Sequence, residues 1–459
     1  MMRLAEAAFA LGVEYRGENA WFTAVGTDTR STRPGELFVA LRGERFDGHR
    51  FLAAAQSGAA AAAMVDVAGA ALAPSHLPLV VVNDTRKALG QLAYAWRSRY
   101  TLPLIALTGS NGKTTVKEML AEILRAAAPN TNNTVLATRG NLNNDIGVPL
   151  MLLELRAEHR YAVIEMGMNH AGEISALSKL ARPGVALITN AGRAHIEFLG
   201  SEEAIARAKG EIFEGLASNA VAVLNADDPH LRLWQELCNK NKCLLFGIEH
   251  PSEISARYAL HALDSDIQLQ TPAGAVSMTL HAPGLHNVRN ALAACAAAFA
   301  LQVPLTAMAC GLSRYAGVKG RLQRKPAHAG ATLIDDTYNA NPESMRAAID
   351  VLAHTPGRRL LVLGDMGELG ERAAACHAEA GEYARAAGIE QLLAFGHLSA
   401  NTVAAFGAGA RHFPRIEELL ADIENRLAPD MTVLVKGSRF MQMERVVKAF
   451  AVDEDERAS

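Results

Sequence analysis

The chain has 459 residues, of which 50% are hydrophobic, and its 45 basic and 48 acidic side chains give a formal net charge of −3. This length suggests about three domains with sizeable cores, and the near balance of charge gives no electrostatic argument for a nucleic-acid partner. The five cysteines form no CxxC pair, and their odd number argues against a disulfide framework.

The first residues, MMRLAEAAFALG, lack the arrangement of a secretory signal peptide. The alanine-rich run Ala53–Ala63 carries Gln56, Ser57 and Gly58 and is too weakly apolar to span a bilayer. Scattered thiols are typical of a reducing compartment. We therefore expect a cytoplasmic protein without stable membrane insertion.

Residues 1–101 predict a small α/β domain. The apolar runs Leu37–Leu41 and Leu79–Val82 are typical of buried strands, and helical patterns cover Ala53–Gln56 and Gln91–Arg99. The turn-rich segment TDTRSTRPGE precedes the first of these strands.

Residues 102–313 alternate between strand and helix patterns, which predicts a mostly parallel sheet covered by helices on both faces. A β-rich stretch at Ile267–Leu280 interrupts the alternation, and a helix over about 287–301 ends it. The expected strands are Leu104–Thr108, Tyr161–Met166, Val185–Asn190, Ala220–Asn225 and Cys243–Phe246.

Residues 314–459 contain a second alternating set, which predicts a smaller, Rossmann-like doubly wound domain. Its expected strands are Ala331–Asp335, Arg359–Leu363, Gln391–Phe395 and Thr432–Val435. The predicted fold class is therefore α/β with three domains.

Residues 102–115 read LPLIALTGSNGKTT and carry the clearest functional signal in the chain. A strand leads into a glycine turn, and the helix that follows has apolar residues at i, i+3, i+4, i+7 and i+8 from Val116. Backbone N–H groups of such a P-loop-type turn bind phosphate, Lys113 neutralises β/γ oxygens, and a Thr hydroxyl binds Mg²⁺. Only Ser110 and Asn111 separate the glycines, where the usual pattern has four residues, so an ordinary strand–turn–helix is the alternative. The predicted phosphate-binding residues are Gly109, Ser110, Asn111, Gly112, Lys113, Thr114 and Thr115.

Side chains directly after the central strands are candidate site residues, because ligands bind beyond the carboxyl ends of parallel strands. Glu165 follows one strand and can bind Mg²⁺, with a surface salt bridge as the alternative. His195 lies in a glycine-containing loop after the next strand; Mg²⁺ prefers oxygen ligands, so a solvent-facing histidine is the alternative. Lys209 lies on the apolar stripe of a helix capped by Ser201, where an ammonium must snorkel, pair or be modified.

Two further groups of polar residues lie at expected strand ends or helix starts. Asn287 and Asn290 share one helix face at i, i+3, where two amides can bind a purine edge, unless Asn287 only caps the helix. Three glycine-bearing loops of the last domain form a second candidate binding face, with the polar residues Asp335, Asp336, Asn339, Asn341, Asp365, Glu368, Lys436 and Arg439.

The segments TGSNGKTT, NAGRAH, AKGEIF, HNVRNALAA and DDTYNANPES, together with the loop of Glu165, resemble the Mur ligase family of ATP-dependent amide-forming enzymes. The resemblance runs from about Thr27 to Met443 and covers all three predicted domains. The short phosphate loop is also a feature of that family.

The resemblance implies ATP and two Mg²⁺ ions as cofactors. Lys113 matches a residue that binds the ATP phosphates, Thr114 and Glu165 match Mg²⁺ ligands, and His195 matches a histidine near a second Mg²⁺. Lys209 matches a lysine that carries a carbamate in several members, which would change its charge from positive to negative and let it bind or position the second metal. The implied catalytic residues are Lys113, His195 and Lys209. The further residues implied to contact ATP are Asn287, Asn290, Asp336 and Arg321.

Two regions select a step within the family. The segment TDTRSTRPGELFVALRGERFDGH resembles the uridine-binding domain of the last two ligases of the pathway, and TRGNLNNDIGVP resembles a muramoyl-binding loop. Ligases that add diaminopimelate carry an Asp-Asn-Pro-Arg signature, whereas this chain has Asn-Ala-Asn-Pro-Glu and LGDMGELG, which suits the final, dipeptide-adding step. The implied substrate-binding residues are Asp28, Arg30, Ser31, Arg33, Thr138, Asn141, Asn143 and Asn144, with Lys436 and Arg439 for the dipeptide.

The implied reaction joins UDP-N-acetylmuramoyl-tripeptide (UDP-MurNAc-tripeptide) and D-alanyl-D-alanine (D-Ala-D-Ala) through an acyl phosphate. We expect residues 1–101 to bind the UDP-sugar, residues 102–313 to bind ATP, and residues 314–459 to close on ATP and the dipeptide. We expect a monomer, although neither an oligomeric state nor the last residue of the tripeptide can be read from the sequence. The alternatives are a sibling ligase (the preceding muramoyl ligase or a folylpolyglutamate synthase-like enzyme) and a nucleotide-dependent binding protein that forms no amide.

Overall fold

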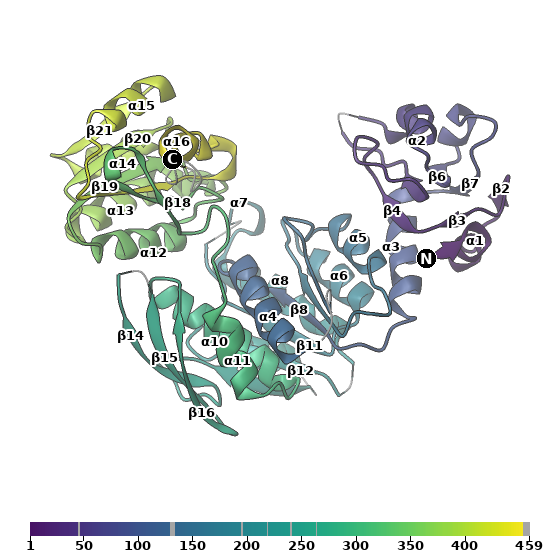
Figure 1. Cartoon of the computed structure of the whole chain (residues 1–459), viewed down its shortest axis with the longest axis horizontal. Helices are drawn as coiled ribbons and strands as arrows, with labels where there is room; N and C mark the ends of the chain where they lie inside the picture. Colours follow the sequence, from purple (N-terminus) through teal and green to yellow (C-terminus); the bar gives the residue numbers. More distant parts are fainter. Residues whose placement is uncertain are drawn as a thin grey trace, which may run out of the picture.

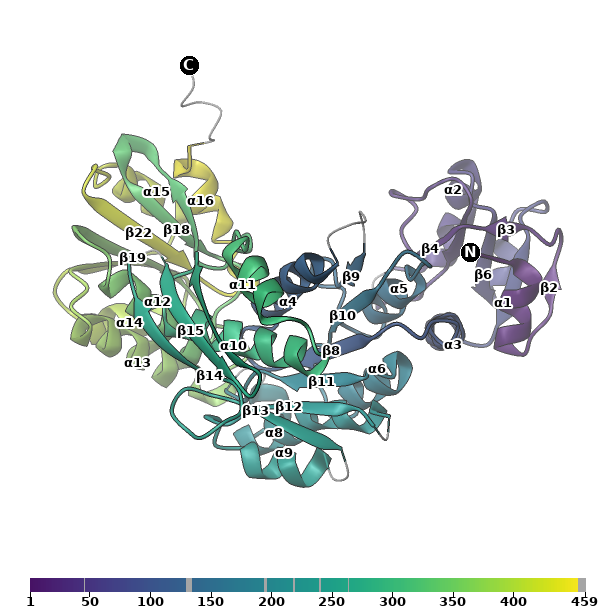
Figure 2. The ribbon, with the colours of Figure 1, turned by 60° about the horizontal axis from the view of Figure 1, so that its bottom comes forward.

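The structure is a computed structural model that describes residues 1–44, 46–128, 134–193, 196–217, 219–238, 241–262 and 264–452. Its elements form three α/β domains in chain order, and the first and last lie at opposite ends of the long axis (Figures 1 and 2). We name them the N-terminal domain, from β1 (Met2–Arg3) to α3 (Thr85–Arg97), the central domain, from β8 (Leu104–Thr108) to α11 (Leu305–Ser313), and the C-terminal domain, from β17 (Gln323–Pro326) to α16 (Glu444–Phe450). Within the described ranges, no helix combines the length and apolar character needed to cross a bilayer.

The N-terminal domain is built on a five-stranded sheet. In spatial order its strands are β2 (Tyr15–Arg16), β7 (Leu79–Val82), β6 (Ala62–Asp66), β5 (Glu36–Val39) and β4 (Ala24–Gly26), accompanied by β3 (Trp21–Phe22), which pairs with β1, and by the helices α1 (Leu4–Leu11) and α2 (Leu52–Ser57). The strands expected in this domain are confirmed as β5 and β7, whereas β6 has no counterpart among them. The helix α3 begins at Thr85 rather than Gln91, because the Asp84 side chain accepts hydrogen bonds from the N–H groups of Arg86 and Lys87.

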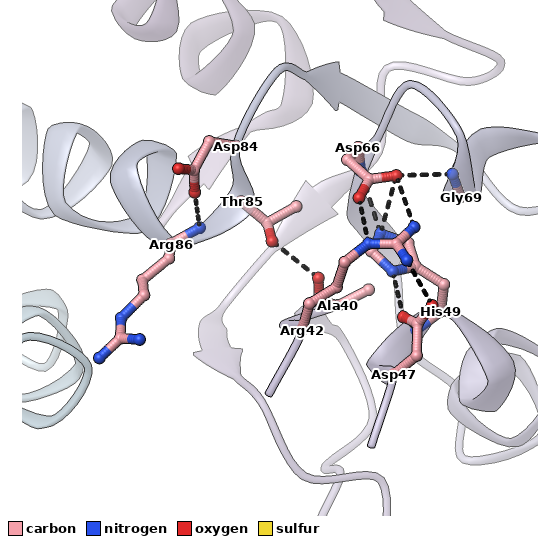
Figure 3. A network of polar contacts seen from close by, with 9 residues as sticks. All are labelled: Ala40, Arg42, Asp47, His49, Asp66, Gly69, Asp84, Thr85 and Arg86. Carbon is pink, nitrogen blue, oxygen red and sulfur yellow. Dashed lines mark hydrogen bonds and ion pairs between the residues drawn. The ribbon is translucent and has the colours of Figure 1, made fainter. Parts of the chain in front are cut away.

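A polar network ties the chain after β5 to the end of β6 (Figure 3). Arg42 donates from Nη1 to Asp47 (2.8 Å) and from Nε to Asp66 (2.6 Å). His49 is buried between the two carboxylates; its Nδ1 lies 2.6 Å from Asp47 Oδ1, and its Nε2 accepts the Asp66 N–H at 3.1 Å. The hydrogen bond from Arg42 is the main cause that lowers the pKa of Asp66 to about 2. The loop that leaves β5 is therefore fixed by charge as well as by packing.

The central domain contains a six-stranded, wholly parallel sheet. In spatial order its strands are β13 (Lys242–Phe246), β12 (Val221–Asn225), β11 (Val185–Ile188), β8, β10 (Tyr161–Glu165) and β9 (Val135–Ala137). The five expected strands are confirmed, and β9 is an additional short edge strand. The parallel order brings the loops after β8, β10 and β11 together at one edge.

Helices cover both faces of this sheet, as expected. Leu104 and Ala106 of β8 pack into one apolar core, and Ile105 and Leu107 pack into the other. The first core contains α5 (Gly147–Leu153), α6 (Glu173–Ala181), α8 (Glu202–Gly210) and α9 (Leu231–Cys238). The second contains α4 (Lys113–Ala127), α10 (Leu285–Ala300) and α11. The β-rich stretch is confirmed as an antiparallel sheet that packs on this second core, with the strands β14 (Ser255–Leu260), β15 (Ser265–Thr271) and β16 (Gly274–Leu280).

The C-terminal domain is doubly wound, as predicted. In spatial order its strands are β17, β18 (Thr332–Asp336), β22 (Met431–Lys436), β19 (Arg358–Gly364), β20 (Gln391–Phe395) and β21 (Ala410–Phe413), and β17 is antiparallel to its neighbour. One face carries α12 (Pro342–Ala353), α13 (Ala373–Ala386) and α14 (Ser399–Phe406), and the other carries α15 (Ile416–Glu424) and α16. The four expected strands are confirmed, and β17 and β21 are additional edge strands.

The two domain interfaces differ in character. Leu92 and Trp96 of α3 belong to the same apolar core as Leu152 and Leu155 of the central domain, and the Trp96 indole N–H donates to Leu155 O (3.1 Å). By contrast, the two apolar clusters of the C-terminal domain include no residue of the central domain, as far as the described residues show. The N-terminal domain is therefore fused to the central domain by apolar packing, and the C-terminal domain is not.

We expect Gly311→Ala to destabilise the central domain, because α11 approaches α4 closely at this position. A Cβ there would lie 2.4 Å from Ile123 Cα, a backbone atom that cannot move aside. Such overpacking lowers the free energy of unfolding by about 1–3 kcal/mol. Gly90→Ala in α3 is the matched control, since a Cβ there meets nothing within 4 Å, and it should add about 0.5–1 kcal/mol of stability. Thermal unfolding midpoints measure both changes; equal midpoints for the two variants would contradict the packing account.

Candidate active site

The phosphate loop joins β8 to α4 and is held by the loop that follows β11. Ser110 N–H donates to Asn190 O (3.0 Å), and Asn111 N–H donates to Asn190 Oδ1 (2.9 Å). In return, the Thr189 hydroxyl and the Asn190 amide donate to Asn111 O, at 2.7 and 3.1 Å. Ser110 Oγ also accepts the Gly192 N–H (2.9 Å). The neighbouring loop therefore fixes the shape of the predicted phosphate site.

Two glycines of this loop occupy positions where a side chain would collide with neighbouring atoms. A Cβ at Gly109 would lie 1.8 Å from Thr189 Oγ1, and a Cβ at Gly112 would lie 2.2 Å from Asn290 Oδ1. Gly112 also has a φ of +81°, which L side chains rarely adopt, and it directly precedes α4. The helix N-terminus is thus presented to the loop, as in sites that bind phosphate.

Lys113 is the first residue of α4 and folds back over the loop. Its Nζ donates to Gly109 O (2.7 Å) and to Ser110 O (3.4 Å). Burial lowers the pKa of Lys113; the charge of Glu165 opposes this shift, and the charge of Arg321 adds to it. A desolvated lysine of this kind is stabilised in its charged form when a phosphate group arrives.

Glu165 ends β10 and is only 2% exposed, so the alternative of a surface salt bridge does not hold. Its Oε1 accepts from the Asn143 amide (2.8 Å), and its N–H donates to Thr138 Oγ1 (2.9 Å). Its Oε2 is buried and has no hydrogen-bond partner among the described residues. An orphaned carboxylate oxygen beside a phosphate loop fits a Mg²⁺ ion, and the Thr114 hydroxyl could offer a second hard oxygen.

The described part of the chain contains no group of three or more His, Cys, Asp or Glu residues arranged for one metal ion. Mg²⁺ usually keeps several waters and binds through one or two carboxylates plus substrate phosphates. The donor set of Glu165 and Thr114 therefore suits Mg²⁺ together with a nucleotide. His195, the predicted residue near a second metal, lies outside the described residues.

Lys209 is buried in the last turn of α8, with 1% exposure, so it does not snorkel to solvent. Ser201 caps this helix as expected, because its Oγ accepts the Ala204 N–H at 3.2 Å. Burial lowers the pKa of Lys209 well below the usual value, and the positive charge of Lys113 lowers it further. Both effects favour the neutral amine more than they would in a lysine exposed to water.

The predicted nucleotide residues gather at the start of α10 and the end of β18. Asn287 and Asn290 are both buried, and their amides are hydrogen-bonded to each other at 3.2 Å. Asp336 receives Lys436 Nζ at 2.6 Å; burial raises the pKa of Asp336, and the charge of Lys436 opposes the shift. Lys436 is 2% exposed, and its Nζ also donates to Asn339 O (2.9 Å). The structure therefore places Lys436 beside a predicted nucleotide residue, whereas Arg439 pairs with Glu444.

Arg321 connects the two sides of the site. Its Nη2 donates to Thr114 Oγ1 (2.9 Å), and its guanidinium carbon lies 4.3 Å from the centre of the Tyr338 ring. Its Nε is buried and has no partner within the part of the chain that the structure describes. A buried N–H donor without a partner is costly, so this arginine is suited to an additional anionic ligand.

One cavity of about 1910 Å³ joins these groups. The predicted residues that line it are Ser110, Asn111, Gly112, Lys113, Thr115, Asn141, Asn143, Asn144, Glu165, Asn287, Asn290, Arg321, Asp336, Asn339, Asn341, Glu368, Lys436 and Arg439. The predicted residues outside this lining are Gly109, Thr114, Thr138, Lys209, Asp28, Arg30, Ser31, Arg33, Asp335 and Asp365. In the N-terminal domain, Asp28 and Arg30 form an exposed ion pair at 2.7 Å.

Sequence reasoning missed several residues that line this cavity or support the loops around it. Asn190 and Arg193 lie in the segment NAGRAH, from which only His195 was selected, and Asp228 follows β12. Asp228 accepts the Ala191 N–H at 2.8 Å and so supports the same loop. Arg86 of α3 lines the cavity from the N-terminal domain and pairs with Asp145 through Nη2 at 2.7 Å. The position of Asn190 and Asp228 after strands was the available signal; nothing local marks Arg86 or Arg193.

A phosphate loop at the carboxyl edge of a parallel sheet, with a buried carboxylate beside it and a second domain above it, defines a nucleoside-triphosphate-dependent α/β enzyme. Sequence models of one protein family match most of the chain. The model described as Mur ligase family, catalytic domain, matches residues 22–97, the Mur ligase middle domain matches residues 107–298, and the Mur ligase, glutamate ligase domain, matches residues 320–439.

Full-length relatives agree with these matches. The UDP-N-acetylmuramoyl-tripeptide–D-alanyl-D-alanine ligase of Escherichia coli (strain K12) is 44% identical over 447 residues, which cover 96% of each chain. A crystal structure of MurF from Acinetobacter baumannii superposes with a TM-score of 0.89 at 37% identity, covering 97% of this chain and 98% of that one. MurF ligase from Thermotoga maritima in complex with ADP gives a TM-score of 0.80 at 28% identity, covering 93% and 96%. The chain belongs to the Mur ligase family, whose members form amide bonds at the expense of ATP.

We expect Gly112→Ala to weaken ADP binding at least about tenfold, or ~1.4 kcal/mol. The new Cβ would take an unfavourable left-handed conformation and would displace the Asn290 amide. Gly172→Ala is the matched control, because Gly172 precedes α6 with a φ of +88° but its Cβ would meet nothing within 4 Å. Isothermal titration with ADP measures the effect. Unchanged affinity in Gly112→Ala would show that the loop does not hold the phosphates.

Proposed function

We propose that this chain joins D-Ala-D-Ala to UDP-MurNAc-tripeptide, with ATP converted to ADP and phosphate. The observation that carries the proposal is the single cavity that contains the phosphate loop, Glu165 and side chains from all three domains. The relatives described above, which are named for this reaction, support the choice of substrates. A ligase of this kind must bring three substrates together, and a cavity shared by three domains suits that need.

The proposed chemistry has two steps. A carboxylate oxygen of the tripeptide attacks the γ-phosphorus of ATP, the bond to the β-γ bridging oxygen breaks, and ADP leaves. The dipeptide amine then attacks the acyl carbon, loses a proton and expels phosphate. Anions meet in the first step, so positive charge at the phosphates is the main requirement, and Lys113 supplies it from the chain. Mg²⁺ held by Glu165 and Thr114 would neutralise phosphate charge when bound.

The domains are proposed to divide the substrates between them. Residues 1–101 would bind the UDP-sugar, with Asp28, Arg30, Ser31 and Arg33 near the uracil or diphosphate. Residues 102–313 would bind ATP, and the segment that contains Asn141, Asn143 and Asn144 would face the muramoyl group. Residues 314–459 would close on ATP and the dipeptide and exclude water, which otherwise hydrolyses an acyl phosphate. We further propose a cytoplasmic location, because ATP is a substrate, and a monomeric state.

Burial and hydrogen bonding support a more specific proposal for three of the predicted roles. Thr138 is 1% exposed and accepts the Glu165 N–H, so its proposed contribution is to orient that carboxylate. Lys436 is paired with Asp336, so its proposed contribution lies at the nucleotide end of the cavity. Arg439 and the neighbouring exposed Phe440 line the cavity and are the better candidates for the dipeptide.

Phosphate release by the purified enzyme tests this function. ATP and UDP-MurNAc-tripeptide are supplied with D-Ala-D-Ala, with diaminopimelate or lysine, with glutamate, or with no amine, and the products are identified by mass spectrometry. The proposal requires a pentapeptide product with the dipeptide alone. Product with a single amino acid would indicate a sibling ligase, and ATP binding without any amide would indicate a nucleotide-dependent binding protein.

We expect Lys113→Ala to reduce ligation at least about 10³-fold, roughly 4 kcal/mol of transition-state stabilisation. The reason is that no other ammonium folds over the phosphate loop in the described ranges. The measurement is coupled ADP release with all three substrates present. Turnover close to that of the unchanged enzyme would remove the role assigned to this lysine.

We propose that Lys209 carries a carbamate in the active enzyme. Its neutral amine nitrogen would attack the carbon of CO₂, release one proton and become an anion able to bind or position a second Mg²⁺. Burial and the lowered pKa of Lys209 support the proposal, because only the unprotonated amine reacts. In ¹³C-bicarbonate, the enzyme should show a carbamate carbon resonance that is absent from Lys209→Ala. An unmodified amine in fully active enzyme, seen by this spectrum, would defeat the proposal.

A further inference from the structure

Arg193 lies in the loop after β11 and reaches across to the C-terminal domain. Its Nε donates to Glu343 Oε1 (2.7 Å) in the first turn of α12, and its Nη1 donates to Glu379 Oε2 (3.3 Å) on α13. The Arg193 side chain is 14% exposed, so both ion pairs are partly shielded from water. Glu343 and Glu379 therefore hold one arginine that belongs to another domain.

The same loop also holds the phosphate loop. Gly192 donates its N–H to Ser110 Oγ (2.9 Å), and that hydroxyl lies 3.1 Å from Gly192 O. From the other side, Asn341, the N-cap of α12, donates from Nδ2 to Asn111 Oδ1 (2.8 Å). The start of α12 is thus connected to the phosphate loop in two ways. Asn341 contacts Asn111 directly. Glu343 binds Arg193, whose neighbour Gly192 is hydrogen-bonded to Ser110.

Polar contacts of this kind are prominent where the C-terminal domain meets the central domain. In the described residues no apolar cluster spans this interface, and the cation of Arg193 contacts two carboxylates at once. Loss of one partner from a shielded ion pair leaves the other charge desolvated and unpaired, which is more harmful than loss of an exposed pair. The interface is therefore sensitive to the charge at Arg193.

We propose that Arg193 is a positioning residue for ligation: it orients the C-terminal domain so that Arg321 and Asn341 reach the phosphate loop. This inference rests on the proposed function, because the orientation matters only where both domains act on one reaction. Arg193 touches no reacting atom; it acts through Glu343 and Glu379 on one side and through its own loop on the other.

The proposal separates the effects on rate and on substrate binding. The proposed contacts of the UDP-sugar and muramoyl group come from the N-terminal and central domains, so they persist when the C-terminal domain is misoriented. Displacement of catalytic groups by about 1 Å can lower a rate 10²-fold. A purely structural ion pair would instead change the unfolding midpoint and leave kcat unchanged.

A double-mutant cycle tests the bridge. We expect Arg193→Gln and Glu343→Gln each to lower kcat about 10- to 100-fold while leaving the KM for UDP-MurNAc-tripeptide nearly unchanged. The double variant should be no worse than Arg193→Gln alone, because the two residues act as one unit. Arg232→Gln is the matched control: this exposed arginine pairs only within its helix in the described ranges, with Glu236 at 3.4 Å, and the variant should behave as the unchanged enzyme.

Small-angle X-ray scattering of the ligand-free variants gives a readout that does not depend on catalysis. We expect a larger radius of gyration for Arg193→Gln and Glu343→Gln than for Arg232→Gln, since the C-terminal domain is released. Additive losses in the cycle, or scattering and kcat values equal to those of the control, would overturn the proposal. If Arg193→Gln does not fold, Glu343→Gln tests the same bridge from the other domain. If the unchanged enzyme forms no amide, the proposed function fails, and the scattering comparison still decides the bridge.

Discussion

The phosphate loop depends on hydrogen bonds that come from its neighbour, the loop after β11. A turn with only Ser110 and Asn111 between its glycines has few groups of its own that can form hydrogen bonds with its backbone N–H and C=O groups. Asn190 accepts from both of these N–H groups through its carbonyl and its side chain, and the Gly192 N–H is held by Ser110 Oγ. Because the parallel order places β11 directly beside β8, two segments about 80 residues apart in sequence form one rigid unit.

This rigid unit lies between two very different interfaces. Leu92 and Trp96 make the N-terminal domain part of the apolar core of the central domain, which favours a fixed arrangement. The C-terminal domain is connected by polar groups such as Arg193 and Arg321, whose partners can be exchanged for water or ligand. Interfaces of this polar kind permit relative motion of domains. The molecule therefore combines two domains in a fixed arrangement with a third that can move, which suits the proposed binding of the sugar nucleotide by the first domain and of ATP and the dipeptide by the last.

The sequence predicted most of the architecture, because long apolar strands give a clear period and the glycine turn has a specific chemistry. Three of the strands that the sequence did not predict are weakly marked in it. β9 and β21 are short edge strands, and β6 lies in an alanine-rich stretch where strand and helix patterns are hard to tell apart. Residues at strand ends, such as Glu165, were predictable because topology alone places them at the sheet edge. The role of Arg193 could not be predicted, since it depends on Glu343, which is distant in sequence and lies in another domain. Nothing in the sequence indicated that Thr138 is buried, because its burial depends on the folded structure.

The electrostatics of the site follow from two buried lysines. Burial lowers the pKa of Lys113 and of Lys209, and the charge of Lys113 disfavours a second charge on Lys209. An arriving polyanion stabilises the ammonium of Lys113 and raises its pKa, so the desolvation that is unfavourable for an unpaired ammonium strengthens the attraction for phosphate. At Lys209 two charges then act in opposite directions, because charged Lys113 disfavours protonation of its amine and the polyanion favours it. If that amine becomes a carbamate anion, as proposed, the repulsion between Lys113 and a protonated Lys209 is replaced by attraction between opposite charges.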